Sequence, residues 1–258
     1  MATERDLLAS QIILKAVLPV AKVVIEEVPA MKKKFQGVNA TFQIQAKNGD
    51  ENIGAYFKFT DGELEIVQGV HGNPDIRFAF GKPESMVAFL TGGIALPKIK
   101  GLGKPGLLMK CVGLLLSLTI LLPNKRPKKY DQVRLKVKMV MYMITTALSQ
   151  YNKGGDPEMV RWTTKQPDRI YQMSCEPEGI AAYVRVKAGK TKAGRGYYKR
   201  KHPFVHMKFH GAQGALPVFM NDVEFVEAVA KGYVTVEGAP EYAMHLNNHM
   251  QQIQALIT

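Results

Sequence analysis

The order of apolar patterns, which occurs twice along the chain, is the feature that most constrains the fold. In each half, runs of alternating apolar and polar residues come first, as in strands, and a helical run, a short strand and an amphipathic helix follow. Gly93 and Gly101 end the helical run and the short strand of the first half, and Gly232 and Gly238 do so in the second. A repeat of this length predicts two duplicated domains rather than a solenoid.

Local signals define the elements within each half. The Asp61-Gly62 pair lies between two alternating runs and predicts a tight β-hairpin, because both residue types accept positive φ. Residues 7–28 predict an amphipathic helix, or a pair kinked at Pro19, and residues 131–151 predict a helix that enters the second domain. The remaining helices are expected at residues 82–93, 107–122, 217–232 and 239–257.

These patterns indicate an α+β protein of two domains. The 258 residues suit two domains of ordinary size, and a hydrophobic share of 46% is enough for two packed cores. Residues 123–129 form a basic linker, so we place the first domain at residues 1–125 and the second at residues 126–258. The net charge of +13, most of it in the second half, favours an anionic partner: nucleic acid, an acidic headgroup or a phosphorylated ligand.

The cysteines and the N-terminus point to the cytoplasm. Cys111 and Cys175 are far apart and have no CxxC neighbour, so neither a disulfide framework nor a thiolate metal site is expected. The opening residues MATERDLLAS place acidic side chains where a signal peptide needs a basic flank, so we expect no export signal. No sequence pattern predicts a cofactor.

Several segments resemble the sterol carrier protein domain, a nonspecific lipid-transfer family. They are DGELEIVQG, DIRFAFGKPESMVAFLTGG and KIKG in the first half and MNDVEFVEAVAKGYVTVEGAPEYAMHLNNHM in the second, and the likeness covers residues 40–122 and 169–256. The resemblance implies two tandem domains, each with a mainly antiparallel five-stranded sheet that helices cover on one face. It also implies an apolar tunnel between the two layers, which would carry a fatty acid, acyl-CoA, sterol or similar lipid.

The apolar faces of the covering helices are the candidate lining of such a tunnel. The candidates are Met86, Val87, Phe89, Leu90, Met109, Leu114, Phe225, Val226, Val229, Tyr242, Met244 and Leu246. Residues 107–122 are apolar on nearly every side, so this helix is expected to be buried between the domains, or to line a cavity or a dimer contact. The segment is too short to span a bilayer comfortably and contains Lys110, which disfavours membrane insertion.

Basic residues surround two tyrosines in residues 187–201 and could contact an anionic headgroup or phosphate. The candidates are Lys190, Lys192, Arg195, Lys199, Arg200 and Lys201. The same composition is typical of a solvated sheet edge, and single-stranded nucleic acid is a third, less favoured partner because no nucleic-acid fold accompanies it.

No pattern predicts catalysis or a metal site. His202, His206 and His210 share one face of a strand, and His245 and His249 are spaced i, i+4, but no third ligand stands at a fixed offset. Paired carboxylates, a GxSxG elbow and phosphate-binding loops are absent from the sequence. We therefore expect a non-enzymatic lipid carrier. The alternatives are an accessory or scaffolding subunit that docks through residues 107–122, as a homo-oligomer or on an enzyme, and an enzyme that uses His206 and His245.

Overall fold

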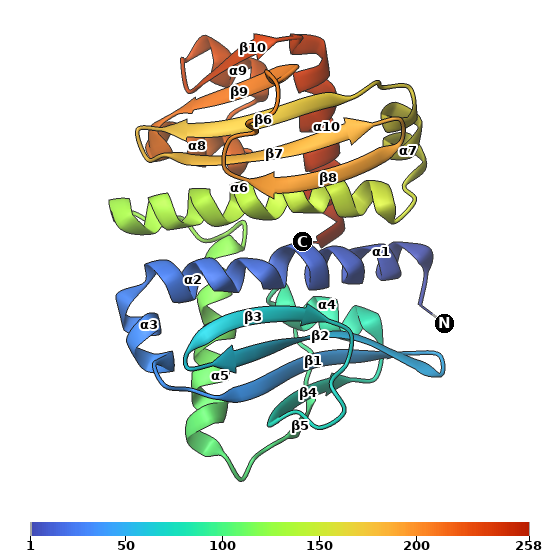
Figure 1. Cartoon of the computed structure of the whole chain (residues 1–258), viewed down its shortest axis with the longest axis vertical. Helices are drawn as coiled ribbons and strands as arrows, with labels where there is room; N and C mark the ends of the chain where they lie inside the picture. The colour runs from blue at the N-terminus through green and yellow to red at the C-terminus, as the bar shows by residue number, and fades with distance from the viewer. Residues whose placement is uncertain (1, 258) are drawn as a thin grey trace. The chain divides into compact units, whose positions relative to one another are not determined.

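The computed structural model describes residues 2–257 and divides into two compact units, one ending at residue 122 and one running from residue 123 to residue 256. This division falls close to the expected boundary after residue 125. Figure 1 shows that each unit consists of one sheet and its own helices.

The first unit contains a five-stranded sheet in the order β3-β2-β1-β4-β5. Its strands are β1 (Ala40–Asn48), β2 (Glu51–Thr60), β3 (Glu63–Gln68), β4 (Ile76–Phe80) and β5 (Lys98–Lys100). Neighbouring strands are antiparallel except β1 and β4, which are parallel. Asp61 and Gly62 join β2 to β3 with φ of 50° and 84°, as the hairpin prediction required.

The second unit repeats this order as β8-β7-β6-β9-β10. Its strands are β6 (Arg169–Glu176), β7 (Ile180–Lys187), β8 (Lys190–Arg195), β9 (Val205–His210) and β10 (Val234–Gly238). Here too one central pair, β6 and β9, is parallel. The prediction of two five-stranded, mainly antiparallel sheets is confirmed, although the parallel pair makes each sheet mixed.

The helices of the first unit begin with a kinked segment. They are α1 (Glu4–Ile12), α2 (Ala21–Glu27), α3 (Pro29–Phe35), α4 (Pro83–Leu90) and α5 (Pro105–Leu118). Between α1 and α2 the chain forms a π turn and a 3₁₀ turn around Pro19, because proline has no N–H for the α-helical ladder. The segment Glu4–Glu27 is long and apolar enough to cross a membrane, but 72% of its apolar window is buried inside the structure, as in a core helix.

The helices of the second unit differ from expectation in two places. They are α6 (Tyr130–Lys153), α7 (Pro157–Thr164), α8 (Gly211–Phe219), α9 (Phe225–Ala230) and α10 (Pro240–Ile257). The single helix expected at residues 217–232 is wrong, because the chain turns at residues 220–224, where Asn221 has a positive φ of 53°. Helix α7 was not predicted.

Helices cover one face of each sheet and leave the other face open. In the second unit, Ser149 of α6 donates a hydrogen bond to Thr191 of β8 (3.2 Å), and Figure 1 shows α8 and α10 behind the sheet. In the first unit, rings fill the space between the sheet and α4: Phe42 packs on Phe78 with ring centroids 5.1 Å apart, and Phe89 packs on Phe80 at 5.3 Å.

On the open face, both units share an arrangement that we call the glutamine clamp. In the first, the Gln43 side chain of β1 accepts a hydrogen bond from the His71 backbone N–H (2.5 Å), and the His71 ring packs edge-on against Tyr56 at 5.2 Å.

In the second unit, Gln172 of β6 accepts from the Tyr198 N–H (2.9 Å), and the Tyr198 ring packs against Tyr183 at 5.0 Å. Gly69 and Gly196 also match, each donating its N–H across the sheet, to Gly54 and Ala181 respectively. The two units therefore share side-chain architecture as well as strand order.

Candidate functional site

A cavity of about 440 Å³ lies in the second unit between α7 and α10. Its lining residues recur at helical spacing, so that one face of each helix forms a wall. They are Glu158, Arg161, Trp162 and Lys165 of α7, Gln166 just after it, and Glu241, Tyr242, His245 and His249 of α10. Gln252 of α10 donates a hydrogen bond to Glu158 (2.8 Å) and ties the two helices together.

The position of α7 follows from its first residues. Asp156 caps the helix by accepting a hydrogen bond from the Met159 N–H (2.9 Å), and Pro157 occupies the first turn, where a missing N–H costs nothing. Thr163 donates to Asn152 of α6 (2.5 Å), which fixes the helix against the rest of the unit.

Aromatic rings form part of the cavity wall and pack against the sheet. Trp162 lies 5.3 Å from the ring of Tyr171 in β6 and 5.3 Å from that of His249. The Trp162 indole Nε1 is buried and has no hydrogen-bond partner among the described residues. An unpaired buried donor costs about 1–3 kcal/mol, and the lack of accessible surface shields this N–H from the cavity as well as from solvent.

Charges of both signs surround the cavity. Arg161, Lys165, Glu158 and Glu241 are exposed, whereas His249 is buried. Burial lowers the pKa of His249, so that its imidazole is neutral around pH 7. At the start of β6, Arg169 stacks between Phe204 (3.9 Å) and Tyr242 (4.4 Å), which anchors the ring of Tyr242.

Among the predicted lining residues, Tyr242 alone is part of this cavity's lining. The other candidates that the structure buries or partly buries belong to packed regions. They are Met86, Val87, Phe89, Leu90, Leu114, Phe225 and Leu246. Phe89, for example, contacts Phe78 and Phe80 of the first sheet and is part of its core.

Four predicted lining residues are exposed, and their assignment to an interior is wrong. They are Met109, Val226, Val229 and Met244. The sequence does not specify whether these side chains point inward or outward, because α5, α9 and α10 each carry apolar residues on both their buried and their exposed sides. Residues 107–122 are likewise not buried all round: Cys111 and Leu114 face inward, whereas Leu116 is exposed.

The predicted basic contact is distributed over a sheet edge and the segment that follows it. Lys190 and Lys192 are exposed on β8, which is the edge strand, while Arg195 lies over the ring of Tyr142 at 4.8 Å. Lys201 forms an ion pair with Asp168 (3.3 Å). Lys199 and Arg200 are exposed in the segment after β8.

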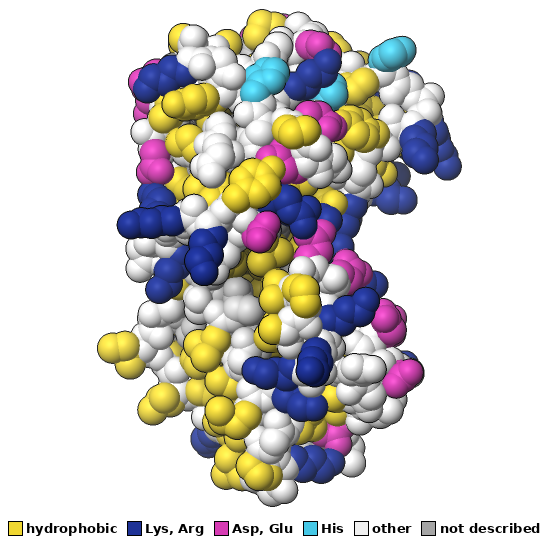
Figure 2. Space-filling view, turned by 90° about the vertical axis from the view of Figure 1, so that its left-hand side faces the viewer, with side chains coloured by type: hydrophobic (Ala, Val, Ile, Leu, Met, Phe, Trp, Pro, Cys, Tyr) yellow, Lys and Arg dark blue, Asp and Glu magenta, His cyan; other side chains and the backbone are white. Residues whose placement is uncertain are grey.

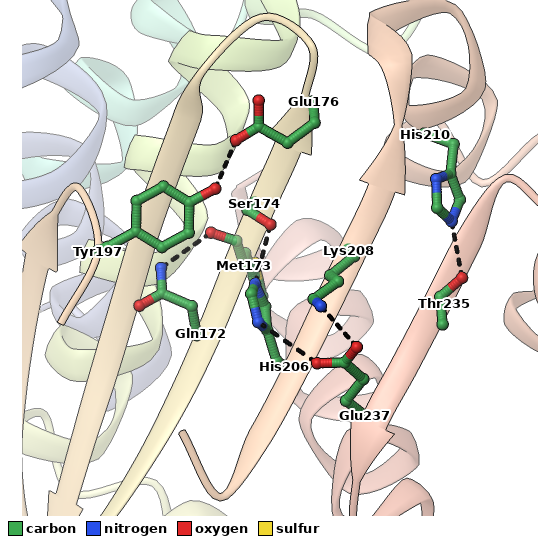
Figure 3. Close-up of polar contacts among 10 residues, drawn as sticks. All are labelled: Gln172, Met173, Ser174, Glu176, Tyr197, His206, Lys208, His210, Thr235 and Glu237. Carbon is green, nitrogen blue, oxygen red and sulfur yellow. Dashed lines mark hydrogen bonds and ion pairs between the residues drawn. The ribbon is translucent and has the colours of Figure 1, made fainter. Parts of the chain in front are cut away.

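A polar cluster on the open face of the second sheet is the other candidate site (Figure 3). Ser174 Oγ and His206 Nε2 lie 2.8 Å apart, and His206 Nδ1 lies 4.0 Å from Glu237 Oε2. The order serine, histidine, carboxylate matches a nucleophilic triad, but 4.0 Å is too long for a hydrogen bond.

The surroundings of this cluster favour a structural role. Ser174 is buried, and Lys208 donates to Glu237 at 2.5 Å, so the carboxylate already has a partner. Burial, together with the charge of Lys208, lowers the pKa of His206. The cluster thus joins β6, β9 and β10 through their side chains.

The predicted histidine pair for catalysis does not come together. His206 belongs to the open-face cluster, whereas His245 lines the cavity on the helical side of the sheet. No group of three or more potential metal ligands occurs within residues 2–257. Both cysteines are buried and form no disulfide, and burial raises the pKa of Cys111 to about 12, which disfavours its thiolate form.

Fold and cavity together define a class: an internally repeated α+β protein with a partly aromatic, partly charged pocket in its second unit. The sequence matches no protein-family model and no curated protein. Solved structures similar to it include two sterol carrier proteins and one enzyme.

The first is palmitated SCP2L2 from Aedes aegypti, at 16% identity over 42% of this chain and 90% of that one, with a TM-score of 0.31. The second is sterol carrier protein domain 2 of Helicoverpa armigera, at 16% identity over 46% and 92%, with a TM-score of 0.32. The third is the sec-alkylsulfatase Pisa1 from Pseudomonas sp., at 12% identity over 62% and 30%, with a TM-score of 0.27. Similarities this low assign neither a family nor a function.

Proposed function

We propose that the second unit binds an amphipathic lipid with an anionic head, such as a fatty acid or an acyl-CoA, in the cavity between α7 and α10. The observation that carries the proposal is a cavity of about 440 Å³ that Trp162 and Tyr242 line and that has two cations, Arg161 and Lys165, at its margin. Ligand sites commonly measure about 300–1,000 Å³ and combine apolar walls with a few polar groups.

Each part of such a ligand has a suitable partner. Apolar chain atoms lie against Trp162 and Tyr242, and each methylene removed from water contributes about 0.8 kcal/mol. Arg161 and Lys165 are placed to attract the carboxylate or phosphate.

The wider proposal is that the chain is a tandem pair of sterol-carrier-like domains with a carrier role, no catalysis of its own, and a place in the cytoplasm. Its support is the repeated strand order, the glutamine clamp present in both units, and two buried cysteines without a disulfide. A tunnel between sheet and helices is not part of the proposal, because the cavity lies between two helices.

A fluorescence titration tests the binding site directly, because Trp162 is the only tryptophan in the chain. Palmitate is a suitable probe, since one of the similar structures is a palmitated protein. Adding palmitate to delipidated protein should change the Trp162 emission saturably. The double variant Arg161→Glu/Lys165→Glu should bind palmitate at least about tenfold more weakly but bind the corresponding fatty alcohol equally well.

Two matched charge reversals complete the test. Lys32→Glu/Lys33→Glu changes the same charge on α3 of the first unit and should leave palmitate binding unchanged. Lys190→Glu/Lys192→Glu examines the basic edge strand. If binding is lost in this variant alone, the anionic contact belongs to β8. If no lipid changes the Trp162 emission, the carrier proposal is contradicted and a scaffolding role is favoured.

A further inference from the structure

The first unit exposes large apolar side chains in the stretch that follows α4. Ile94 and Leu96 are 102% and 91% exposed, and Leu102 and Met109 are 66% and 67% exposed. Single exposed apolar residues are common, but four such residues within 16 positions of sequence are typical of an interaction site.

Lysines and an absence of acidic residues give this stretch its charge. Between residues 85 and 130 the sequence contains no aspartate or glutamate. Lys98, Lys100, Lys104 and Lys110 lie among the exposed apolar residues in sequence. We call the four apolar residues and these four lysines the apolar-basic surface. Figure 2 shows hydrophobic side chains interspersed with Lys and Arg over the first unit.

Side-chain contacts hold this surface in place. Lys104 pairs with Asp75 (2.5 Å) and Lys100 donates to Asn73 (3.0 Å), which fixes the turn between β5 and α5 against the start of β4. On α5, Cys111, Leu114 and Leu118 are buried in the unit, so the helix presents Met109 outward from a fixed base.

We propose that the apolar-basic surface docks the first unit on an anionic lipid bilayer. Ile94, Leu96 and Leu102 enter the interfacial region. The lysines other than Lys104, which Asp75 already pairs, contact the headgroups while their alkyl stems stay in the apolar layer. Each lysine near an anionic membrane adds to the attraction. With 14 residues, α5 is too short to span the bilayer, so the contact is peripheral.

Charge decides between a bilayer and other occupants. A second copy of this chain would bring a further +13 of like charge and a second acid-free segment to the contact, which opposes association. An anionic membrane offers both a counter-charge for the lysines and an apolar layer for the exposed apolar side chains of this surface. The basic strand β8 lies in the other unit and is a separate candidate for anionic contact.

Vesicle co-sedimentation of the full chain tests this inference, with phosphatidylcholine vesicles that contain or lack phosphatidylserine. The protein should bind the anionic vesicles, and less so as salt is raised. Ile94→Asp/Leu96→Asp and Lys98→Glu/Lys100→Glu should each weaken binding at least about tenfold. Val226→Asp, at an exposed position of α9 in the second unit, should bind as the unaltered protein does.

Other outcomes contradict the proposal. Binding that persists in Ile94→Asp/Leu96→Asp, or that is lost only in Lys190→Glu/Lys192→Glu, would assign the membrane contact elsewhere. An assembly in light scattering that dissociates on Ile94→Asp/Leu96→Asp would identify the surface as a contact between copies. Vesicle binding does not require a filled cavity, so failure of this test is distinguishable from failure of palmitate binding.

Discussion

Two glutamines in the middle of the sheets show how a polar side chain is accommodated there. Gln172 is fully buried, and its amide Nε2 donates to the carbonyls of Met173 (3.0 Å) and Ala182 (2.9 Å). Its oxygen accepts from the backbone N–H of Tyr198. The side chain therefore fastens the segment after β8 to the open face of the sheet, and Gln43 does the same for the segment after β3.

Replacing this amide should destabilise the second unit. Gln172→Met keeps the volume but leaves the Tyr198 N–H without its acceptor, which should lower the free energy of unfolding by about 1–3 kcal/mol. Urea unfolding measures the loss, and amide exchange at Tyr198 should accelerate. Gln43→Met should have the corresponding effect on His71, whereas Gln213→Met, at an exposed site on α8, should have little effect. Equal stability of Gln172→Met would show that the clamp is dispensable.

The sequence predicted few of the individual residues that line the candidate site. Tyr242 was found because it stands in the final amphipathic helix. Trp162 was missed together with α7, although the signal was present: Gly154-Gly155 ends one helix, and Asp156-Pro157 is a helix start. Whether the side chains of the remaining candidates point inward or outward depends on packing against the sheet, which the spacing of apolar residues in the sequence does not specify.

The connection from the fifth strand to the last helix is the element that both units build in the same way. Gly101 and Gly238 have φ of 97° and 93°. A Cβ on Gly101 would lie 2.3 Å from the Asp75 carbonyl oxygen, and one on Gly238 would lie 2.1 Å from that of Phe204. These carbonyls immediately precede β4 and β9, so each glycine permits the same close approach of backbones.

Alanine at either position should therefore be costly. Gly238→Ala and Gly101→Ala combine an unfavourable φ with a clash against backbone that cannot move aside, and we expect each to reduce the free energy of unfolding by more than about 1 kcal/mol. Chemical denaturation measures this. Gly103→Ala is the matched control, because a Cβ there meets nothing within 4 Å and φ is not positive. A neutral Gly238→Ala would imply that the connection can rearrange.

The sequence predicted the secondary-structure elements better than it predicted the candidate site. Alternation with period two and the Asp61-Gly62 turn located the strands, and the paired glycines located the ends of β5 and β10. The break between α8 and α9 was not predictable from apolar spacing, because the pattern continues through the turn at residues 220–224.

For the whole molecule we expect a single lipid per chain. The cavity belongs to the second unit, and in the first unit phenylalanine rings fill the space between the sheet and α4. Native mass spectrometry of the palmitate-loaded protein should show one added ligand, and the count should fall in Arg161→Glu/Lys165→Glu. Two bound lipids would show that the first core opens to admit a chain.

The glutamine clamp has a consequence for how such a chain can change over time. It lies on the face of each sheet away from the helices, so mutations that remodel a pocket leave it untouched. In each unit, residues on the helical side can therefore change to suit a different ligand while the contacts of the open face keep the sheet folded.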